Sequence, residues 1–327
     1  MVGTHALIQE GVEFKSLGLA VIDEQHRFGV MQRAVLRQKG ASPDVLIMTA
    51  TPIPRTLALT LYGDLDYSVM RGLPPGRTPV ATLLYSEADK AMVYKEIDNE
   101  VASGGQVYVV YPVIEEQGPD EAEGVRPALK SAEEGFEGLK RLFPKFRISL
   151  IHGKMKTAER EAAMAAFKAG GVDVLVATTV IEVGVDVPNA SLMVIVHAER
   201  FGLAQLHQLR GRVGRGRRAS RCAMLAYGGL SDKARRRLEA MAATTDGFKI
   251  AEADLDIRGP GEFTGTRQSV MPELRVAHLV RDALLVEPAR EEAFSLLQAD
   301  PMLQSHPELR AAAEGFWQGR MELYKTG

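Results

Sequence analysis

Two neighbouring carboxylates, Asp23 and Glu24, follow directly on an apolar run, residues 19–22, whose composition is that of a buried strand. Acidic residues at the carboxyl end of a parallel strand lie where open α/β sheets bind their ligands. There, one carboxylate can hold Mg²⁺ while its neighbour orients and deprotonates an attacking water. A solvated acidic turn would have the same sequence, so the pair alone does not decide between these interpretations.

Arg212 and Arg215 form a second candidate pair, in the segment 208–215 that reads QLRGRVGR. Residues three apart on a helical turn project to the same side, so we expect both guanidinium groups to point one way. Gly211 and Gly214 would leave room for a large anion beside them. Such a pair suits the γ-phosphate of a nucleotide, where positive charge stabilises the transition state. The alternative is a solvated basic helix that also includes Arg217, Arg218 and Arg221.

Hydroxyl side chains follow two further apolar runs, residues 45–48 and 172–177. Four threonines lie just beyond these runs: Thr49, Thr51, Thr178 and Thr179. A hydroxyl at a strand end can bond an acidic site or a phosphate group, although it can equally cap the helix that follows. Asp186, later in the second loop, could take a ribose hydroxyl.

A scaffold for these residues is indicated by seven short apolar runs that alternate with longer helical stretches. The runs are rich in β-branched residues and show little alternation, which is typical of parallel strands covered on both faces. Strand–helix alternation predicts the α/β class. The predicted strands are residues 19–22, 45–48, 106–111, 148–151, 172–177, 192–196 and 222–226.

Two helices have start signals with the spacing of a capping box, in which side chains satisfy the free amides of the first turn. The pairs are Ser86 with Asp89 and Ser131 with Glu134. In the first helix, the residues expected to face the sheet are Val93, Ile97 and Val101.

The domain organisation follows from two changes in composition. A proline-rich segment, residues 73–79, cannot continue a helix or a central strand and is typical of a linker. After about residue 245 the apolar runs stop and polar-faced helices follow. We therefore expect a first α/β domain over residues 1–77, a second over 78–245, and a helical region over 246–327.

The composition of the 327 residues, with 46% hydrophobic, 25% charged and a net charge of −2, is that of an ordinary globular protein and excludes wholesale disorder. A single cysteine, Cys222, excludes an internal disulfide and a cysteine-rich zinc site. No apolar run reaches the roughly 18 residues that a membrane span needs, and the first residues are unlike a secretory signal. We expect an intracellular protein that does not contact a membrane.

Four segments, taken together and in order, resemble motifs II, III, V and VI of superfamily-two helicases, whose motor is a pair of RecA-like domains. They read Asp-Glu-Gln-His, Thr-Ala-Thr, Thr-Thr…Gly…Asp and Gln…Gly-Arg…Gly-Arg. Their neighbours resemble the RecG family of bacterial branch-migration helicases, including its TRG translocation motif. The segments that carry this resemblance are residues 23–30, 51–56, 152–156, 198–203 and 254–269. The transcription-repair coupling translocases are the nearest alternative, and Gln25 after the acidic pair favours RecG.

The resemblance implies one partial and one complete RecA-like parallel sheet, followed by a mostly helical TRG region. It implies an ATP-dependent helicase that moves on branched double-stranded DNA in recombination and repair, in the bacterial cytoplasm, with ATP and Mg²⁺ as cofactors. Asp23 would hold Mg²⁺, Glu24 would be the catalytic base, and Arg212 and Arg215 would be the arginine fingers. The residues implied to line the nucleotide site are Gln25, His26, Gly184, Asp186 and Gln208. Those implied to contact DNA or to couple it to hydrolysis are Thr4, His5, Thr49, Thr51, Thr178, Thr179, Arg258 and Gln268.

One departure from the family is large: the 327 residues contain no Gly-x-x-x-x-Gly-Lys-Ser/Thr phosphate loop. In the family this loop precedes the matched residues, as does the DNA-reading wedge domain. We therefore expect that the chain by itself neither hydrolyses ATP at a useful rate nor translocates. Residues 1–77 would form only part of a sheet, whose apolar face we expect to be covered by self-association or by helix rearrangement. The alternative function is a non-catalytic module that binds DNA or a partner.

Overall fold

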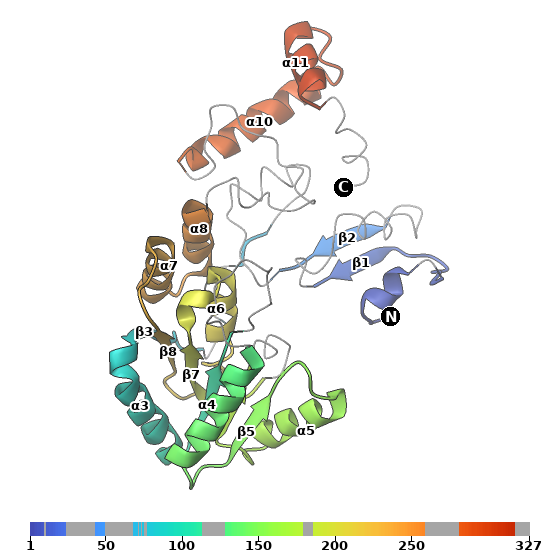
Figure 1. Ribbon diagram of the computed structural model, residues 1–327. Coiled ribbons are helices and arrows are strands. Elements are labelled where there is room, and N and C mark those ends of the chain that lie inside the picture. The colour runs from blue at the N-terminus through green and yellow to red at the C-terminus, as the bar shows by residue number, and fades with distance from the viewer. Residues whose placement is uncertain are drawn as a thin grey trace, which may run out of the picture. The chain divides into compact units, whose positions relative to one another are not determined.

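The computed structural model describes residues 1–9, 11–23, 43–49, 68–70, 72, 74, 77–112, 128–178, 186–258 and 281–317. The chain divides into two compact units (Figure 1). Unit 1 comprises Met1–Tyr67 and Arg258–Gly327, and unit 2 comprises Ser68–Ile257. The domain boundaries predicted from the sequence stay predictions.

Unit 2 is built on a sheet of six strands, in the order β3-β8-β7-β4-β6-β5, and all the pairings between neighbours are parallel. Its strands are β3 (Ala81–Ser86), β4 (Gln106–Val110), β5 (Ile148–Ile151), β6 (Val174–Ala177), β7 (Ala190–Val196) and β8 (Arg221–Ala226). Every residue of β4, β6 and β7 is buried. The absence of polar–apolar alternation in these runs therefore reflects a sheet that is covered on both faces.

Helices cover both faces of this sheet, as Figure 1 shows. They are η3 (Glu87–Asp89), α3 (Lys90–Ala102), α4 (Ala128–Leu142), α5 (Thr157–Lys168), η5 (Ala198–Arg200), α6 (Leu203–Arg210), α7 (Asp232–Ala243) and α8 (Gly247–Arg258). On one face, α3 and α4 pack their apolar side chains against Val107 and Val109 of β4. On the other face, α5, α6 and α7 pack with Tyr108 and Val110. Successive residues of a strand point to opposite faces, so β4 alone contributes to both cores.

The predicted strands agree closely with the observed ones: all seven are present, with ends that differ by at most two residues. β3, which follows the proline-rich segment, was not predicted from the sequence. β3 lies at an edge of the sheet, and most of its side chains are exposed. It therefore lacks the continuous apolar run that identified the other strands.

One of the two predicted capping boxes is confirmed. The Ser86 amide and hydroxyl both donate to Asp89 Oδ2, at 3.0 and 2.6 Å, and Val93 and Ile97 of the following helix are buried against the sheet. The other prediction is wrong, because Ser131 lies inside α4, which already includes Ala128. Ala128, Leu129 and Lys130 are strong helix formers, so the helix extends through the expected cap.

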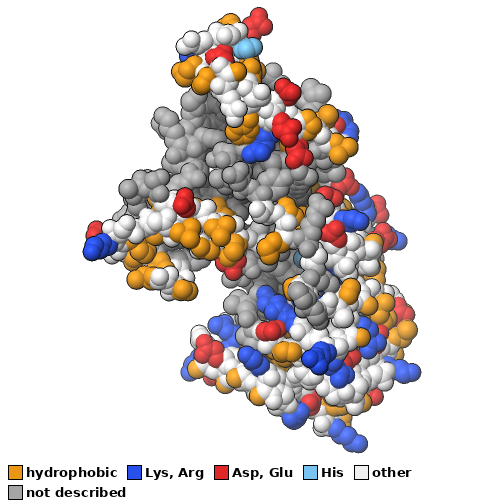
Figure 2. All heavy atoms as spheres, turned by 180° about the vertical axis from the view of Figure 1, so that it is seen from behind, with side chains coloured by type: hydrophobic (Ala, Val, Ile, Leu, Met, Phe, Trp, Pro, Cys, Tyr) orange, Lys and Arg blue, Asp and Glu red, His pale blue; other side chains and the backbone are white. Residues whose placement is uncertain are grey.

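Unit 1 contains a two-stranded parallel sheet of β1 (Leu19–Ile22) and β2 (Asp44–Ile47). Its described helices are η1 (His5–Ile8), α10 (Ala283–Ala299) and α11 (Pro307–Trp317). Leu19, Val21 and Leu46 are each more than half exposed, on one face of the small sheet. Figure 2 shows hydrophobic side chains gathered over this part of the chain. Across the described ranges of both units, no helix is long and apolar enough to span a bilayer.

Candidate functional site

The candidate site of unit 2 is the loop of residues 211–220, hereafter the arginine loop, which joins α6 to β8. Helix α6 ends at Arg210, with Gly211 as its C-cap, and Gly214 has a φ of +76°. Such a φ favours glycine and turns the chain away from a helical path. The prediction that Arg212 and Arg215 share a helical turn is therefore wrong, because both lie beyond the end of the helix.

The glycines of the arginine loop let it pack closely on residues 77–80. A Cβ atom on Gly214 would lie 2.7 Å from Val80 Cγ2. Arg77 donates from Nη2 to the Gly211 carbonyl at 2.7 Å and from Nε to the Gly214 carbonyl at 3.2 Å. The spacing of Gly211 and Gly214, which we interpreted from the sequence as space for an anion, thus serves the turn and its close packing.

The side chain of Arg215 is oriented by two contacts. Its Nε donates to the Gly211 carbonyl at 3.0 Å, and its Nη1 lies 3.5 Å from Asp186 Oδ1. Asp186 is exposed, so this ion pair adds little stability. Arg212 is half-buried in the same loop. Burial raises the pKa of Tyr108 to about 12, while the positive charges of Arg212 and Arg215 oppose that rise.

The arginine loop and Asp186 lie at the edge of the unit 2 sheet where the strands begin. The loop leads into Arg221, the first residue of β8, and Asp186 shortly precedes β7. Thr178 lies at the opposite edge, where it follows β6, is buried, and donates its amide to the Ile151 carbonyl at 3.2 Å. The structure therefore brings Asp186 to Arg215 and keeps Thr178 away from both.

Gln208, another predicted residue of unit 2, is half-buried on α6. The predicted residues that lie outside the described part of the chain are Glu24, Gln25, His26, Thr51, Thr179, Gly184 and Gln268. Arg258 is the last residue of α8.

In unit 1, the structure brings Asp23 and Thr49 to one edge of the small sheet. Asp23 follows β1 and Thr49 comes shortly after β2, and the Met48 amide donates to the Ile22 carbonyl at 2.7 Å across the two strands. Both side chains are exposed. Thr4 is the N-cap of η1 and accepts a long 3.5 Å hydrogen bond from the Ala6 amide, while His5 is the first residue of that turn.

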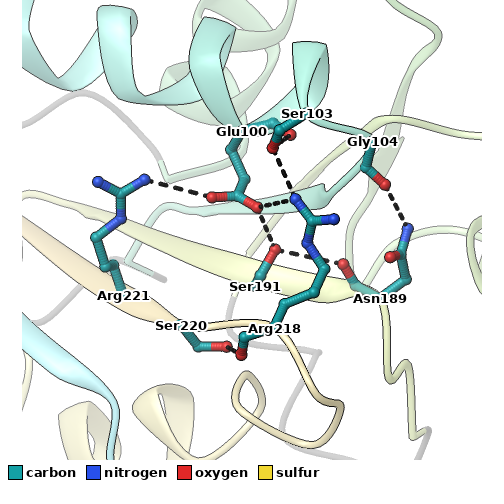
Figure 3. Close-up of polar contacts among 8 residues, drawn as sticks. All are labelled: Glu100, Ser103, Gly104, Asn189, Ser191, Arg218, Ser220 and Arg221. Atoms are coloured by element: carbon teal, nitrogen blue, oxygen red, sulfur yellow. Dashed lines mark hydrogen bonds and ion pairs between the residues drawn. The ribbon is translucent and has the colours of Figure 1, made fainter.

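A buried carboxylate that sequence reasoning missed fixes the other end of the arginine loop. Glu100, 5% exposed in the last turn of α3, pairs with Arg218 at 3.2 Å and Arg221 at 3.3 Å (Figure 3). Ser191 donates its hydroxyl to Glu100 Oε1 at 2.6 Å, and Arg218 Nη2 donates to Ser103 Oγ at 2.6 Å. The interpretation of Arg218 and Arg221 as part of a solvated helix is therefore wrong. The spacing of Glu100 from Val93 and Ile97 could have placed it on the buried face of α3.

Arg210, the last residue of α6, also has a structural role. Its guanidinium is buried and donates to the Met241 and Thr244 carbonyls at 3.0 and 2.7 Å, which ties α6 to the end of α7. Its Nη2 lies 3.2 Å from His207 Nδ1. Burial and the charge of Arg210 lower the pKa of His207 to about 4, so the ring is neutral near pH 7 and accepts this hydrogen bond.

The described residues suit a nucleotide phosphate better than they define a metal site. Arg215 is oriented through a backbone carbonyl and an exposed carboxylate, so a phosphate group can compete for its charge. Within the described ranges, no group of three or more His, Cys, Asp or Glu residues is placed to hold a metal ion. Asp23 is a carboxylate at a strand end, the type of oxygen ligand that Mg²⁺ accepts.

The parallel sheet with helices on both faces and the arginine loop define a RecA-like domain of the helicase C-terminal class. Residues 90–217 match the model of the helicase conserved C-terminal domain. Residues 244–326 match the model described as ATP-dependent DNA helicase RecG, domain 3, C-terminal. The chain is therefore similar to the C-terminal region of RecG helicases.

Relatives of this family match almost the whole chain. The ATP-dependent DNA helicase RecG of Synechocystis sp. is 54% identical over 95% of this chain and 36% of its own length. That of Escherichia coli is 52% identical over 88% of this chain and 41% of its own length. A structure of RecG bound to a three-way DNA junction is 46% identical, with a TM-score of 0.64 over 88% of this chain and 36% of that one. The chain thus spans less than half the length of these relatives.

Proposed function

We propose that this chain is part of the motor of an ATP-dependent, RecG-type helicase that translocates on branched double-stranded DNA in recombination and repair, in the bacterial cytoplasm. The arginine loop is the observation that carries the proposal. Its Arg215 is oriented by the Gly211 carbonyl and by the exposed carboxylate of Asp186, so an anion can compete for its charge. The RecG relative solved with a three-way DNA junction supports branched DNA as the substrate class.

In this proposal, Arg212 and Arg215 stabilise the charge that develops on the γ-phosphate of ATP, and Asp186 and Gln208 help to line the nucleotide site. Asp23 contributes to holding Mg²⁺, which would neutralise phosphate charge when bound, and Glu24 orients and deprotonates the attacking water. Gln25, His26 and Gly184 would complete the nucleotide site. Thr178 lies at the other edge of the sheet from Asp186, which supports a separate role in contacting DNA.

The remaining assignments belong to the same proposal. Residues proposed to contact DNA or to couple it to hydrolysis are Thr4, His5, Thr49, Thr51, Thr179, Arg258 and Gln268. Since the 327 residues contain no phosphate loop, we propose that they do not turn over ATP when produced alone.

The decisive experiment measures DNA-stimulated ATP hydrolysis in the longer protein of which this chain is proposed to be a part. Arg212→Ala and Arg215→Ala should each lower kcat by about a thousandfold, the scale of an arginine finger. Arg217→Ala is the matched control, because Arg217 is an exposed arginine of the same loop with no assigned role. If kcat for Arg215→Ala equals that of the control, the assignment of the arginine loop to ATP hydrolysis is wrong.

A second candidate is a module that binds DNA without hydrolysing ATP. Fluorescence anisotropy with a labelled three-way junction, combined with ATP hydrolysis by the longer protein, separates the two. Salt-sensitive binding would be expected from either, because phosphate neutralisation dominates such affinities. Tight junction binding by a longer protein that shows no DNA-stimulated ATP hydrolysis would favour the binding module.

Self-association of unit 1 is the last part of the proposal. The exposed side chains of Leu19, Val21 and Leu46 form an apolar face on the two-stranded sheet, and such faces favour association in water. Light scattering of the chain at micromolar concentration tests it, with Val21→Lys as the variant expected to reduce association. A monomeric unsubstituted chain would rule it out.

A further inference from the structure

Arg77 contacts the arginine loop at two points. Its Nη2 donates to the Gly211 carbonyl at 2.7 Å and its Nε to the Gly214 carbonyl at 3.2 Å, across a sequence separation of more than 130 residues. A guanidinium is suited to this task, because its rigid fork of donors can bond two carbonyls at once. Arg77 thus fixes the distance between the two glycines on either side of Arg212.

The same carbonyl joins Arg77 to Arg215. Gly211 O accepts one hydrogen bond from Arg77 Nη2 at 2.7 Å and another from Arg215 Nε at 3.0 Å, which uses both lone pairs of the oxygen. Arg215 has one further described contact, with the exposed carboxylate of Asp186 at 3.5 Å. The position of the Arg215 guanidinium therefore depends on where Arg77 holds the Gly211 carbonyl.

Neighbouring contacts make this arrangement stiff. Gly214 packs so closely on Val80 that a Cβ atom would lie 2.7 Å from Val80 Cγ2. Val80 directly precedes β3, whose first residue, Ala81, donates its amide to the Ser220 carbonyl at 3.1 Å at the far end of the loop. Residues 77–81 thus form a support for the arginine loop along its length.

We propose that Arg77 is a positioning residue that presents Arg215 to its ligand, through the Gly211 carbonyl that both arginines share. Its importance for hydrolysis depends on the function proposed above, in which the ligand is the γ-phosphate of a nucleotide. Arg77 belongs to unit 2, which begins at Ser68, so its contacts with the arginine loop lie within one unit.

Hydrogen exchange of the 327-residue chain tests the structural half of the inference. Arg77→Met should make the amides of residues 211–216 exchange about tenfold faster, the factor for losing about 1.4 kcal/mol of local hydrogen bonding. Arg237→Met is the matched control, because Arg237 also donates to a backbone carbonyl of unit 2, that of Glu199 at 2.9 Å. Unchanged exchange in the loop of Arg77→Met, or equal acceleration in the control, would overturn the inference.

Kinetics of the longer protein test the functional half. Arg77→Met should lower kcat for ATP by about tenfold with little change in KM, since Arg215 acts on the transition state. Arg77→Lys, which can still reach the Gly211 carbonyl, should recover part of the loss. A loss that Lys does not recover, or a kcat unaffected by Arg77→Met while Arg215→Ala is impaired, would contradict Arg77 as a positioning residue. An unimpaired Arg215→Ala would instead contradict the proposed function.

Discussion

Arg215 and Arg218 lie three residues apart in one loop, yet their guanidinium groups have different kinds of partner. Arg218, with Arg221, pairs with the buried carboxylate of Glu100, and Ser191 and Ser103 complete that cluster. Arg215 bonds the Gly211 carbonyl and faces the exposed carboxylate of Asp186. A buried carboxylate holds Arg218 and Arg221 in place by ion pairing, whereas a neutral carbonyl orients Arg215 without opposing its charge. We infer that the second half of the loop anchors it and the first half carries the function.

Glu100→Gln should lower the unfolding free energy more than the other substitutions below, because it removes the charge that Arg218 and Arg221 share. Removing one partner of a buried ion pair typically costs about 3–5 kcal/mol. Because both arginines are partly exposed, we expect a loss of about 3 kcal/mol of unfolding free energy. Urea denaturation of the chain measures it as a lower midpoint at constant m-value. The exposed Glu137→Gln, which removes the partner of Lys140, should change stability by less than about 0.5 kcal/mol. Equal effects of the two substitutions would contradict the anchoring role.

Gly214→Ala should have the next largest effect, and it falls on the functional half of the loop. A side chain at φ +76° is strained, and its Cβ would press on Val80, so we expect a loss of about 2 kcal/mol. The measurement is the same urea titration, with Gly228→Ala as a control that has a positive φ but open space around it. If both variants lose the same stability, close packing on Val80 contributes nothing.

A pH dependence of stability should come from His207, which contacts Arg210 at the end of α6. The pKa of His207 is lowered to about 4 in the folded chain from its ordinary 6.5, so the unfolded chain binds a proton first as the pH falls. Unfolding free energy should therefore be unaffected by this group above pH 6.5 and should fall between pH 6.5 and 4. His207→Asn keeps an acceptor for Arg210 without titrating in this range. The difference in unfolding free energy between pH 7.5 and pH 5.0 should be smaller for His207→Asn than for the unsubstituted chain. An equal difference would assign the pH dependence to other groups.

Asp186→Asn should have the smallest effect on stability, in contrast to Glu100→Gln. Because Asp186 is exposed and its contact with Arg215 is 3.5 Å long, we expect less than about 0.5 kcal/mol of lost stability. The thermal unfolding midpoint of the chain gives this quantity. A loss as large as that of Glu100→Gln would mean that both halves of the loop are anchored by their carboxylates.

The sequence predicted the strands of the scaffold more closely than it predicted the arrangement of the site. Apolar runs such as residues 106–111 identified their strands to within one residue, because burial on both faces leaves a pattern within a few positions. The exposed edge strand β3 has no such pattern and was missed. Ser131 was misassigned as a cap because a capping box is a short pattern that can also occur inside a helix.

For the site, the sequence supplied candidate residues but not their arrangement. Arg212 and Arg215 were identified as the candidate pair, but the helical turn assigned to them ends at Arg210. The glycine spacing was noticed, although its structural cause is packing on Val80 and hydrogen bonding to Arg77. Glu100 was not identified as a partner for Arg218, since nothing within α3 indicates which distant residue will face it.

By itself, the sequence determined the α/β class, the strands with apolar runs, and the residue types of the arginine loop. These properties depend on local composition and periodicity, which a few neighbouring residues express. Only the tertiary structure decided that Arg77 reaches Gly211 and that Glu100 reaches Arg218, across 134 and 118 positions of the chain. Such contacts form when strands far apart in sequence pair in one sheet and bring their preceding loops to one edge. That arrangement separates the arginines that anchor the loop from those that can bind a ligand.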